Sequence, residues 1–289
     1  MRKTKLNIVF LLIAFLALQN SGRAEKNFLW KVESSNSTVY LLGSIHVAKA
    51  SLYPLSETIE KAYSASDYLV VEVNQENINP MKMLQMASYT DSNTLEMNVS
   101  KDAYDKLASY FEKHQFPKEK YNKFKPWFAL MTLLGLELVS NGYNPEMGID
   151  SHFMSQAKEA GKPILELESF DSQMEMLETG VTKFSEAFIN LSLGDYEKTA
   201  EEVDKMFDLW KKGDAEGLEK SLSADTVAGH SEAMKFLLDN RNYKMADKVR
   251  EYLKSGKTHF VVVGSAHLVG PIGIINLLNE EKNYKIKQM

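Results

Sequence analysis

The sequence predicts an α/β fold in which a central mixed β-sheet carries flanking helices and a large helical insertion. Three observations lead to this class. Short apolar segments rich in β-branched and aromatic residues stand near both ends of the chain, a β-loop-α-β pattern follows the first pair, and helical periodicity fills the long middle. With 289 residues, of which 44% are hydrophobic and 25% charged, the composition is that of a folded globular protein.

The first residues have the pattern of a signal peptide. Basic Arg2, Lys3 and Lys5 precede an apolar run over residues 6–18, and small residues at 22 and 24 suit a cleavage site. We therefore expect residues 1–24 to be a signal peptide and 25–289 to be a single exported domain, periplasmic or extracellular. The apolar run is shorter than the ~20 residues that span a bilayer, so no stable membrane anchor is expected after cleavage.

Charge and cysteine content exclude several classes of function. Removing residues 1–24 leaves 30 basic against 39 acidic side chains, a formal charge of −9. Nucleic-acid binding needs a surplus of Lys and Arg, and is not expected. Without cysteine, the chain has neither thiol catalysis nor thiolate metal sites.

The predicted elements follow in order along the chain. Two strands over 28–32 and 38–42 flank a polar turn and form a hairpin; Pro54 then opens a helix, and 68–73 is a buried strand. From about 81 to 250 the pattern is chiefly helical, which we interpret as an insertion packed onto the same domain. Its helices are expected at 101–114, 126–141, 149–160, 172–193, 197–212 and 231–240, with one strand at 163–167.

The end of the chain returns to the opening pattern. A strand over 257–263 and an apolar helix over 272–278 are expected, and a short strand near 284–286 would close the sheet. Within the insertion, the Met-rich stretch 81–89 and the stretch 127–138 are expected to be helical core. The alternative is that they line a peptide-binding cleft.

One motif that occurs twice indicates chemistry. Residues 43–46 and 264–267 both have the sequence Gly-Ser-x-His, each at the end of an apolar strand. Ligand sites of open α/β sheets lie beyond the carboxyl ends of strands, so His46 and His267 are expected to face one pocket, and Glu72 to reach the same edge. Two imidazoles and a carboxylate suit a divalent metal ion such as Mn, Co or Zn. The alternative is that each His only hydrogen-bonds its own strand end.

These motifs resemble the TraB/PrgY/GumN family, which is related to the Tiki ectodomains. The resemblance rests on the pair of G-x-x-H motifs, on Glu72, on a middle motif at 148–153, on Arg241 and Asn242, and on the stretch 260–271. It implies a fold like that of the ChaN and erythromycin-esterase proteins and, from the Tiki proteins, a metal-dependent protease that clips a secreted ligand. This chain departs from many members in having Asn74 where they have Asp.

The resemblance also implies roles for individual residues. His46 and His267 would bind the metal, and Glu72 would be the third ligand or the base that deprotonates a bound water. Glu168 is a second carboxylate candidate or, alternatively, a buried partner of Arg241. Arg241 itself would polarise a substrate carbonyl or hold a peptide carboxylate.

The remaining candidates are weaker. Asn242 would orient Arg241 or act as an oxyanion donor. His152 is a candidate for a residue that supports the metal ligands without touching the metal itself. No role is expected for His114, His230 or His259, and the chain lacks a P-loop, a G-x-S-x-G elbow and an H-E-x-x-H motif.

The sequence thus predicts an exported metal-dependent hydrolase that acts on peptides or another small secreted ligand. Two alternatives stay open. The same cleft could bind a peptide or glycan without catalysis, or His46 could serve as the base of a metal-independent, esterase-like hydrolase.

Overall fold

A computed structural model describes residues 26–180, 189, 196–223 and 230–289, and the predicted signal peptide lies outside this part. Its centre is a six-stranded mixed sheet with the order β4-β3-β5-β2-β1-β6. Strands β4, β3, β5 and β2 run parallel, whereas β1 is antiparallel to β2 and β6 is antiparallel to β1. The strands are β1 (Leu29–Glu33), β2 (Thr38–Ser44), β3 (Tyr68–Val71), β4 (Ile164–Glu166), β5 (Thr258–Gly264) and β6 (Lys285–Gln288).

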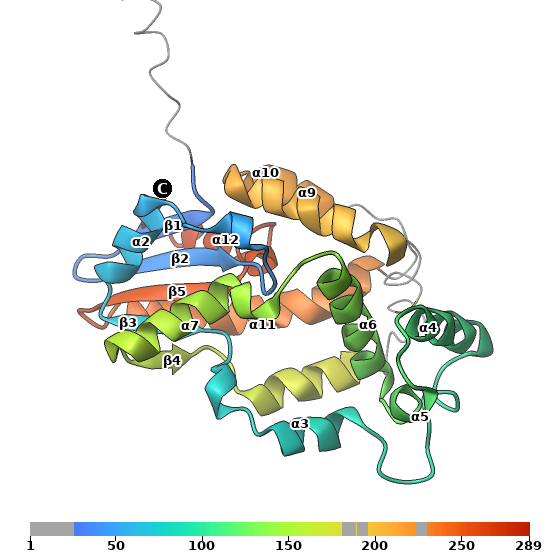
Figure 1. The fold of residues 1–289 in the computed structure, drawn as a ribbon. Helices are drawn as coiled ribbons and strands as arrows, with labels where there is room; N and C mark the ends of the chain where they lie inside the picture. The colour runs from blue at the N-terminus through green and yellow to red at the C-terminus, as the bar shows by residue number, and fades with distance from the viewer. Residues whose placement is uncertain (1–25, 181–188, 190–195, 224–229) are drawn as a thin grey trace, which may run out of the picture.

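Helices cover both faces of the sheet and build a second, all-helical half beside it (Figure 1). The α-helices are α2 (Glu57–Ser64), α3 (Pro80–Ala87), α4 (Lys101–Lys113), α5 (Lys118–Tyr121), α6 (Pro126–Ser140), α7 (Ile149–Ala160), α9 (Thr199–Lys211), α10 (Ala215–Ser223), α11 (His230–Tyr252) and α12 (Ile274–Asn279). Short 3-10 helices are η1 (Ala50–Leu52), η2 (Gln75–Asn77), η3 (Pro145–Met147), η4 (Tyr196–Lys198) and η5 (Ser265–His267). Residues 170–180 are also helical.

This architecture confirms the predicted α/β class and most of its elements. The opening hairpin and the closing strand β6 are present. The structure adds that β2 pairs with β5 in parallel. Helix α11 is longer than the predicted 231–240, so Arg241 and Asn242 lie within this helix. The predicted helix 172–193 is described only in part.

Helix α3 corrects the expectation that the stretch 81–89 is core. Asn79 caps the helix and Pro80 is its first residue, as the local sequence favours. However, the side chains of Met81 and Leu84 are exposed, at 65% and 50%. Trp127, Leu130 and Leu133 on α6 are buried, as expected, whereas Met131 of the same helix is 54% exposed.

The buried apolar residues form separate clusters in the two halves. The larger one surrounds the sheet and includes Phe153 of α7, Phe260 of β5 and Val249 of α11. A second cluster lies within the helical half, around Phe111, Tyr121 and neighbouring residues. Of the helices in the described part of the chain, none is long and apolar enough to cross a membrane.

Close packing fixes the strand end that carries the first Gly-Ser-x-His motif. The Nε1 of Trp210 on α9 donates to the carbonyl oxygen of Gly43 at 2.7 Å, and the Phe28 ring packs directly over Gly43. A Cβ at position 43 would lie 2.4 Å from the Phe28 ring and 2.7 Å from Ser265 Oγ. Only glycine therefore fits where β2 ends.

We predict that Gly43→Ala destabilises the fold by about 1–3 kcal/mol, because the new methyl group overpacks this contact. Chemical denaturation of the chain from Glu25 measures the change. Gly135→Ala on α6 is the matched control: its Cβ would meet nothing within 4 Å, so stability should rise by about 0.5–1 kcal/mol. Equal effects of the two substitutions would contradict this account of Gly43.

Candidate active site

The parallel pairing of β2 and β5 brings the two Gly-Ser-x-His motifs side by side. Ser44 is the register partner of Gly264, and the hydroxyl of Ser265 donates to the carbonyl oxygen of Ser44 at 3.0 Å. Strand β3 pairs with β5 on its other side, so Glu72, the residue after β3, reaches the same edge. The sheet thus gathers the predicted residues at the carboxyl ends of three strands, where ligand sites of such sheets lie.

Glu72 is buried, and both of its carboxylate oxygens accept hydrogen bonds. The backbone N–H of Gly264 donates to Oε1 and the guanidinium of Arg241 donates to Oε2, each at 2.6 Å. Burial by itself would raise the pKa of Glu72, but the positive charges around it, including Arg241, and the Gly264 N–H outweigh this and lower the pKa. The carboxylate is therefore held ionised.

Arg241 joins Glu72 to a second carboxylate. Its Nε lies 3.0 and 2.9 Å from the two oxygens of Glu168, and its Nη2 lies 2.7 Å from Glu168 Oε2. The side chains of these residues are only 10–13% exposed. Of the two roles considered for Glu168, the structure shows the buried partner of Arg241. The N–H groups of Arg241 donate to these carboxylates rather than pointing into an open cleft.

His267 is buried and held by an amide. Its Nδ1 lies 2.5 Å from Oδ1 of Asn242, whose Nδ2 donates to the carbonyl oxygen of Ile272 at 3.0 Å. This chain of bonds orients the amide oxygen toward the ring, so Nδ1 carries the proton and Nε2 has a free lone pair. Burial lowers the pKa of His267 to about 4, despite the opposing charge of Glu72. Nε2 lies 3.8 Å from Glu72 Oε1.

His46 faces a carboxylate instead. Its Nδ1 lies 3.2 Å from Oδ1 of Asp150, in the first turn of α7, and Asp150 also accepts hydrogen bonds from Ser44 Oγ and Gln75 Nε2. The partial desolvation of the ring by nearby protein atoms would lower the pKa of His46, but Asp150 outweighs this effect and raises the pKa to about 9. Because 61% of the side chain is accessible to water, solvent also moderates the effect of burial.

The three predicted side chains converge on one small region in front of Gly264. The position that a Cβ on Gly264 would occupy lies 3.2 Å from Glu72 Oε1, 3.6 Å from His46 Nε2 and 3.6 Å from Cδ2 of His267. Since the Nδ1 atoms of both rings are occupied elsewhere, both Nε2 atoms are available toward this region. Because glycine has no side chain, a space remains at Gly264 that adjoins both imidazoles and the Glu72 carboxylate.

A model of the TraB/PrgY/gumN family matches residues 28–288, nearly the whole described part of the chain. The chain belongs to the TraB/PrgY/gumN family. The uncharacterized proteins YbaP of Escherichia coli K12 and of Shigella flexneri are each 24% identical to it over 235 residues, which cover 81% of this chain and 85% of theirs. No solved structure matches the chain.

The residues of this TraB/PrgY/gumN protein do not fit a metal ion as they are arranged. Within the described ranges, no three His, Asp or Glu side chains form a group that could hold one. Both carboxylate oxygens of Glu72 already accept hydrogen bonds from N–H donors, and one of these donors is the positively charged guanidinium of Arg241. A bound metal would have to displace or repel that guanidinium.

The other histidines whose side chains the structure describes lie outside this site. His152 contacts Gln156 and Glu60, and its ring packs at a tilt against Tyr53. His259 is buried between the rings of Tyr68 and Tyr252. His114 bonds Tyr196 and lies near Glu137, and the side chain of His230 is outside the described part. Asn242 orients His267 rather than Arg241.

Sequence reasoning missed Asp150. It lies in the middle motif of the TraB/PrgY/gumN resemblance, but nothing in its neighbourhood along the chain connects it with His46. Helix α7 makes the connection, because the N–H of Ile149 donates to the carbonyl oxygen of Ile45 at 3.1 Å and sets the start of α7 against the His46 loop.

We predict that Arg241→Met costs about 3–5 kcal/mol of stability, because it leaves two buried carboxylates without their cation. Urea denaturation measures the loss. Adding Glu168→Gln should recover part of it, since one buried charge is then removed. Lys101→Met, which breaks an exposed pair with Asp105, is the control and should change stability little. A loss for Arg241→Met no larger than for this control would contradict the assigned role.

Proposed function

We propose that this protein is a hydrolase that cleaves peptides with a water molecule bound in front of Gly264. The observation that supports it is the convergence of His46, His267 and Glu72 on that space. His267 Nε2 and Glu72 Oε1 are 3.8 Å apart, too far for a direct hydrogen bond. A single water hydrogen-bonded to both atoms fits this separation.

The different partners of the two imidazoles divide the proton transfers between them. His267 donates its Nδ1–H to an amide oxygen, so its Nε2 is free to accept a proton from the attacking water. His46 faces the Asp150 carboxylate, which favours a ring that carries protons on both nitrogens and can donate from Nε2. One ring is thus the general base and the other the general acid.

In the proposed reaction every proton is accounted for. The water oxygen forms a bond to the peptide carbonyl carbon while its proton passes to His267, and Glu72 stabilises the imidazolium that results. When the C–N bond breaks, the leaving amine takes a proton from His46. Return of a proton from His267 to His46 completes the cycle. Arg241 holds Glu72 ionised, and Asp150 and Asn242 hold the two rings in place.

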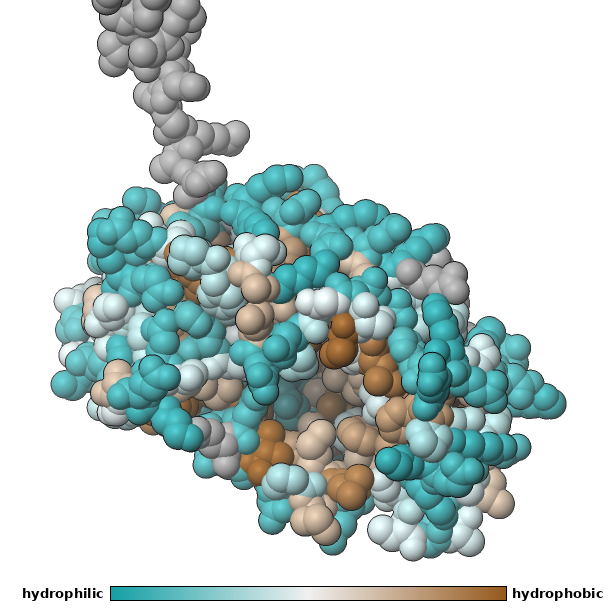
Figure 2. Space-filling model, in the orientation of Figure 1, coloured by the Kyte–Doolittle hydropathy of each residue, from teal (hydrophilic) through white to brown (hydrophobic). Residues whose placement is uncertain are grey.

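Peptides are the proposed substrate because of the surface beside the site. Figure 2 shows a hollow between the sheet-bearing half and helices α3 and α6, with apolar side chains around it. Exposed Met81 and Leu84 of α3 and Met131 and Val139 of α6 belong to these helices. Flexible methionine side chains adapt to varied apolar partners, as peptide-binding surfaces require.

The proposal keeps the predicted export of the chain. Cleavage of the signal peptide 1–24 would release the hydrolase into the periplasm or the medium. A metal-dependent hydrolase stays a prediction, with His46, His267 and Glu72 as ligands of Mn, Co or Zn. It requires the metal ion to replace Arg241 as the partner of Glu72. Binding of peptide or glycan without cleavage is the alternative from another functional class.

The test is a mass-spectrometric screen of peptide libraries with the chain from Glu25, in the presence and absence of a chelator. We expect cleavage that the chelator does not change. His267→Gln, Glu72→Gln and His46→Ala should each lower the rate by about 10²–10⁴-fold, the usual contribution of acid–base groups. His152→Ala, a histidine outside the site, should retain the activity.

Two results would contradict the proposal. Loss of cleavage with chelator and recovery with Mn²⁺, Co²⁺ or Zn²⁺ would establish the metal-dependent enzyme. Saturable capture of peptides without any cleavage, unchanged by Glu72→Gln, would establish the binding protein.

A further inference from the structure

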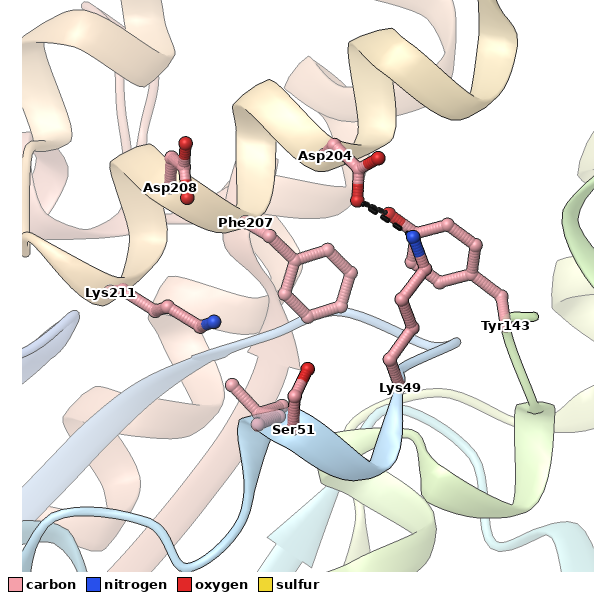
Figure 3. Close-up of a pocket in the computed structure, with 8 residues that line it drawn as sticks. Lys49, Ser51, Tyr143, Asp204, Phe207, Asp208 and Lys211 are labelled. Atoms are coloured by element: carbon pink, nitrogen blue, oxygen red, sulfur yellow. Dashed lines mark hydrogen bonds and ion pairs between the residues drawn. The ribbon is translucent and has the colours of Figure 1, made fainter. Parts of the chain in front are cut away.

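A cavity lies apart from the candidate active site, between the loop after β2 and helix α9 (Figure 3). Its volume is about 220 Å³, below the 300–1,000 Å³ typical of sites for drug-sized ligands. We call it the α9 pocket. It shares no lining residue with the active site and is lined by Lys49, Ser51, Leu52, Tyr143, Asp204, Phe207, Asp208 and Lys211.

On one side of the α9 pocket, the charged side chains of the lining neutralise each other. Lys49 Nζ lies 3.0 Å from Asp204 Oδ1 and 4.3 Å from the centre of the Tyr143 ring. The hydroxyl of Tyr143 donates to the same Asp204 oxygen at 2.5 Å. Phe207 and Leu52, each 7% exposed, form an apolar floor that is already buried. These groups shape the pocket but leave little capacity for a ligand.

The other side has polar groups that are not used. Among the residues that the structure describes, the side chains of Ser51, Asp208 and Lys211 take part in no hydrogen bond or ion pair. Asp208 and Lys211 stand three positions apart on α9, a spacing that allows ion pairs, yet they do not pair. Figure 3 shows Lys211 Nζ and the Ser51 hydroxyl directed to the same open space beside the Phe207 ring.

We propose that the α9 pocket binds a small zwitterion, namely a free α-amino acid with a small side chain. Lys211 and Ser51 would hold its carboxylate and Asp208 its ammonium group. The lining contains two Lys and two Asp side chains, so a ligand without net charge keeps the pocket balanced, whereas a simple anion or cation meets a like charge. The volume and the buried floor favour a ligand with little apolar surface.

The α9 pocket is also connected to the His46 loop. The backbones of Ala48 and Asn144 exchange two hydrogen bonds, at 3.1 and 2.8 Å, and their chain neighbours Lys49 and Tyr143 line the pocket. The same two segments continue to His46 and to Asp150. An amino acid is moreover what peptide cleavage would release, although binding in the pocket does not depend on that proposed function.

The experiment is a binding titration of the chain from Glu25 with L-alanine, followed by calorimetry and by NMR shifts of residues 49–52 and 204–211. Propionate and ethylamine serve as the two half-ligands. We expect saturable binding of L-alanine, and at least about tenfold weaker binding of either half-ligand, since each loses a charged contact. Lys211→Ala and Asp208→Asn should each weaken L-alanine binding by about tenfold, while Lys212→Ala, an exposed neighbour outside the pocket, should not.

Three results would overturn the proposal. One is the absence of saturable shifts in these segments at millimolar L-alanine with folded protein. Another is binding of propionate as tight as that of L-alanine, which would indicate a plain anion site. The third is equal affinity of the native chain and the two pocket variants, which would place the ligand elsewhere.

Discussion

The bridge that Arg241 makes between Glu72 and Glu168 is the constraint on which the site depends. It links the residues that follow β3 and β4 to helix α11, and the side chains involved are largely buried from solvent. Because a buried carboxylate is costly without a cation, the position of Arg241 fixes where Glu72 can lie. Glu72 then accepts the N–H of Gly264, so the same bridge also aligns the end of β5 and the turn that carries His267.

Two similar motifs end in two different chemical environments. The parallel pairing of β2 and β5 places His46 and His267 at one edge, but it does not make them equivalent. An amide holds His267 and burial keeps it neutral, whereas a carboxylate holds His46 and favours its charged form. A difference of this kind lets two groups of the same type act as acid and base.

Much of this arrangement could be predicted from the sequence because local patterns carry it. The strand ends with Gly-Ser-x-His follow from β-rich runs and turn residues, and strand parallelism then brings His46, His267 and Glu72 to one edge. The partners could not be predicted in the same way. Asp150 meets His46 only because α7 begins against the His46 loop. The sequence left two roles open for Glu168, because the choice between them depends on where α11 places Arg241. The exposure of Met81 also escaped prediction, since apolar composition does not tell which side of a helix finds a partner.

The most direct test of this account is an NMR titration of the two imidazoles in the native chain and in Asp150→Asn. The structure predicts that His267 stays neutral down to about pH 4, that His46 titrates near pH 9, and that only His46 shifts downward when Asp150 loses its charge. If both histidines titrate together near the ordinary value of about 6.5, or if Asp150→Asn leaves His46 unchanged, the division of roles between them is wrong.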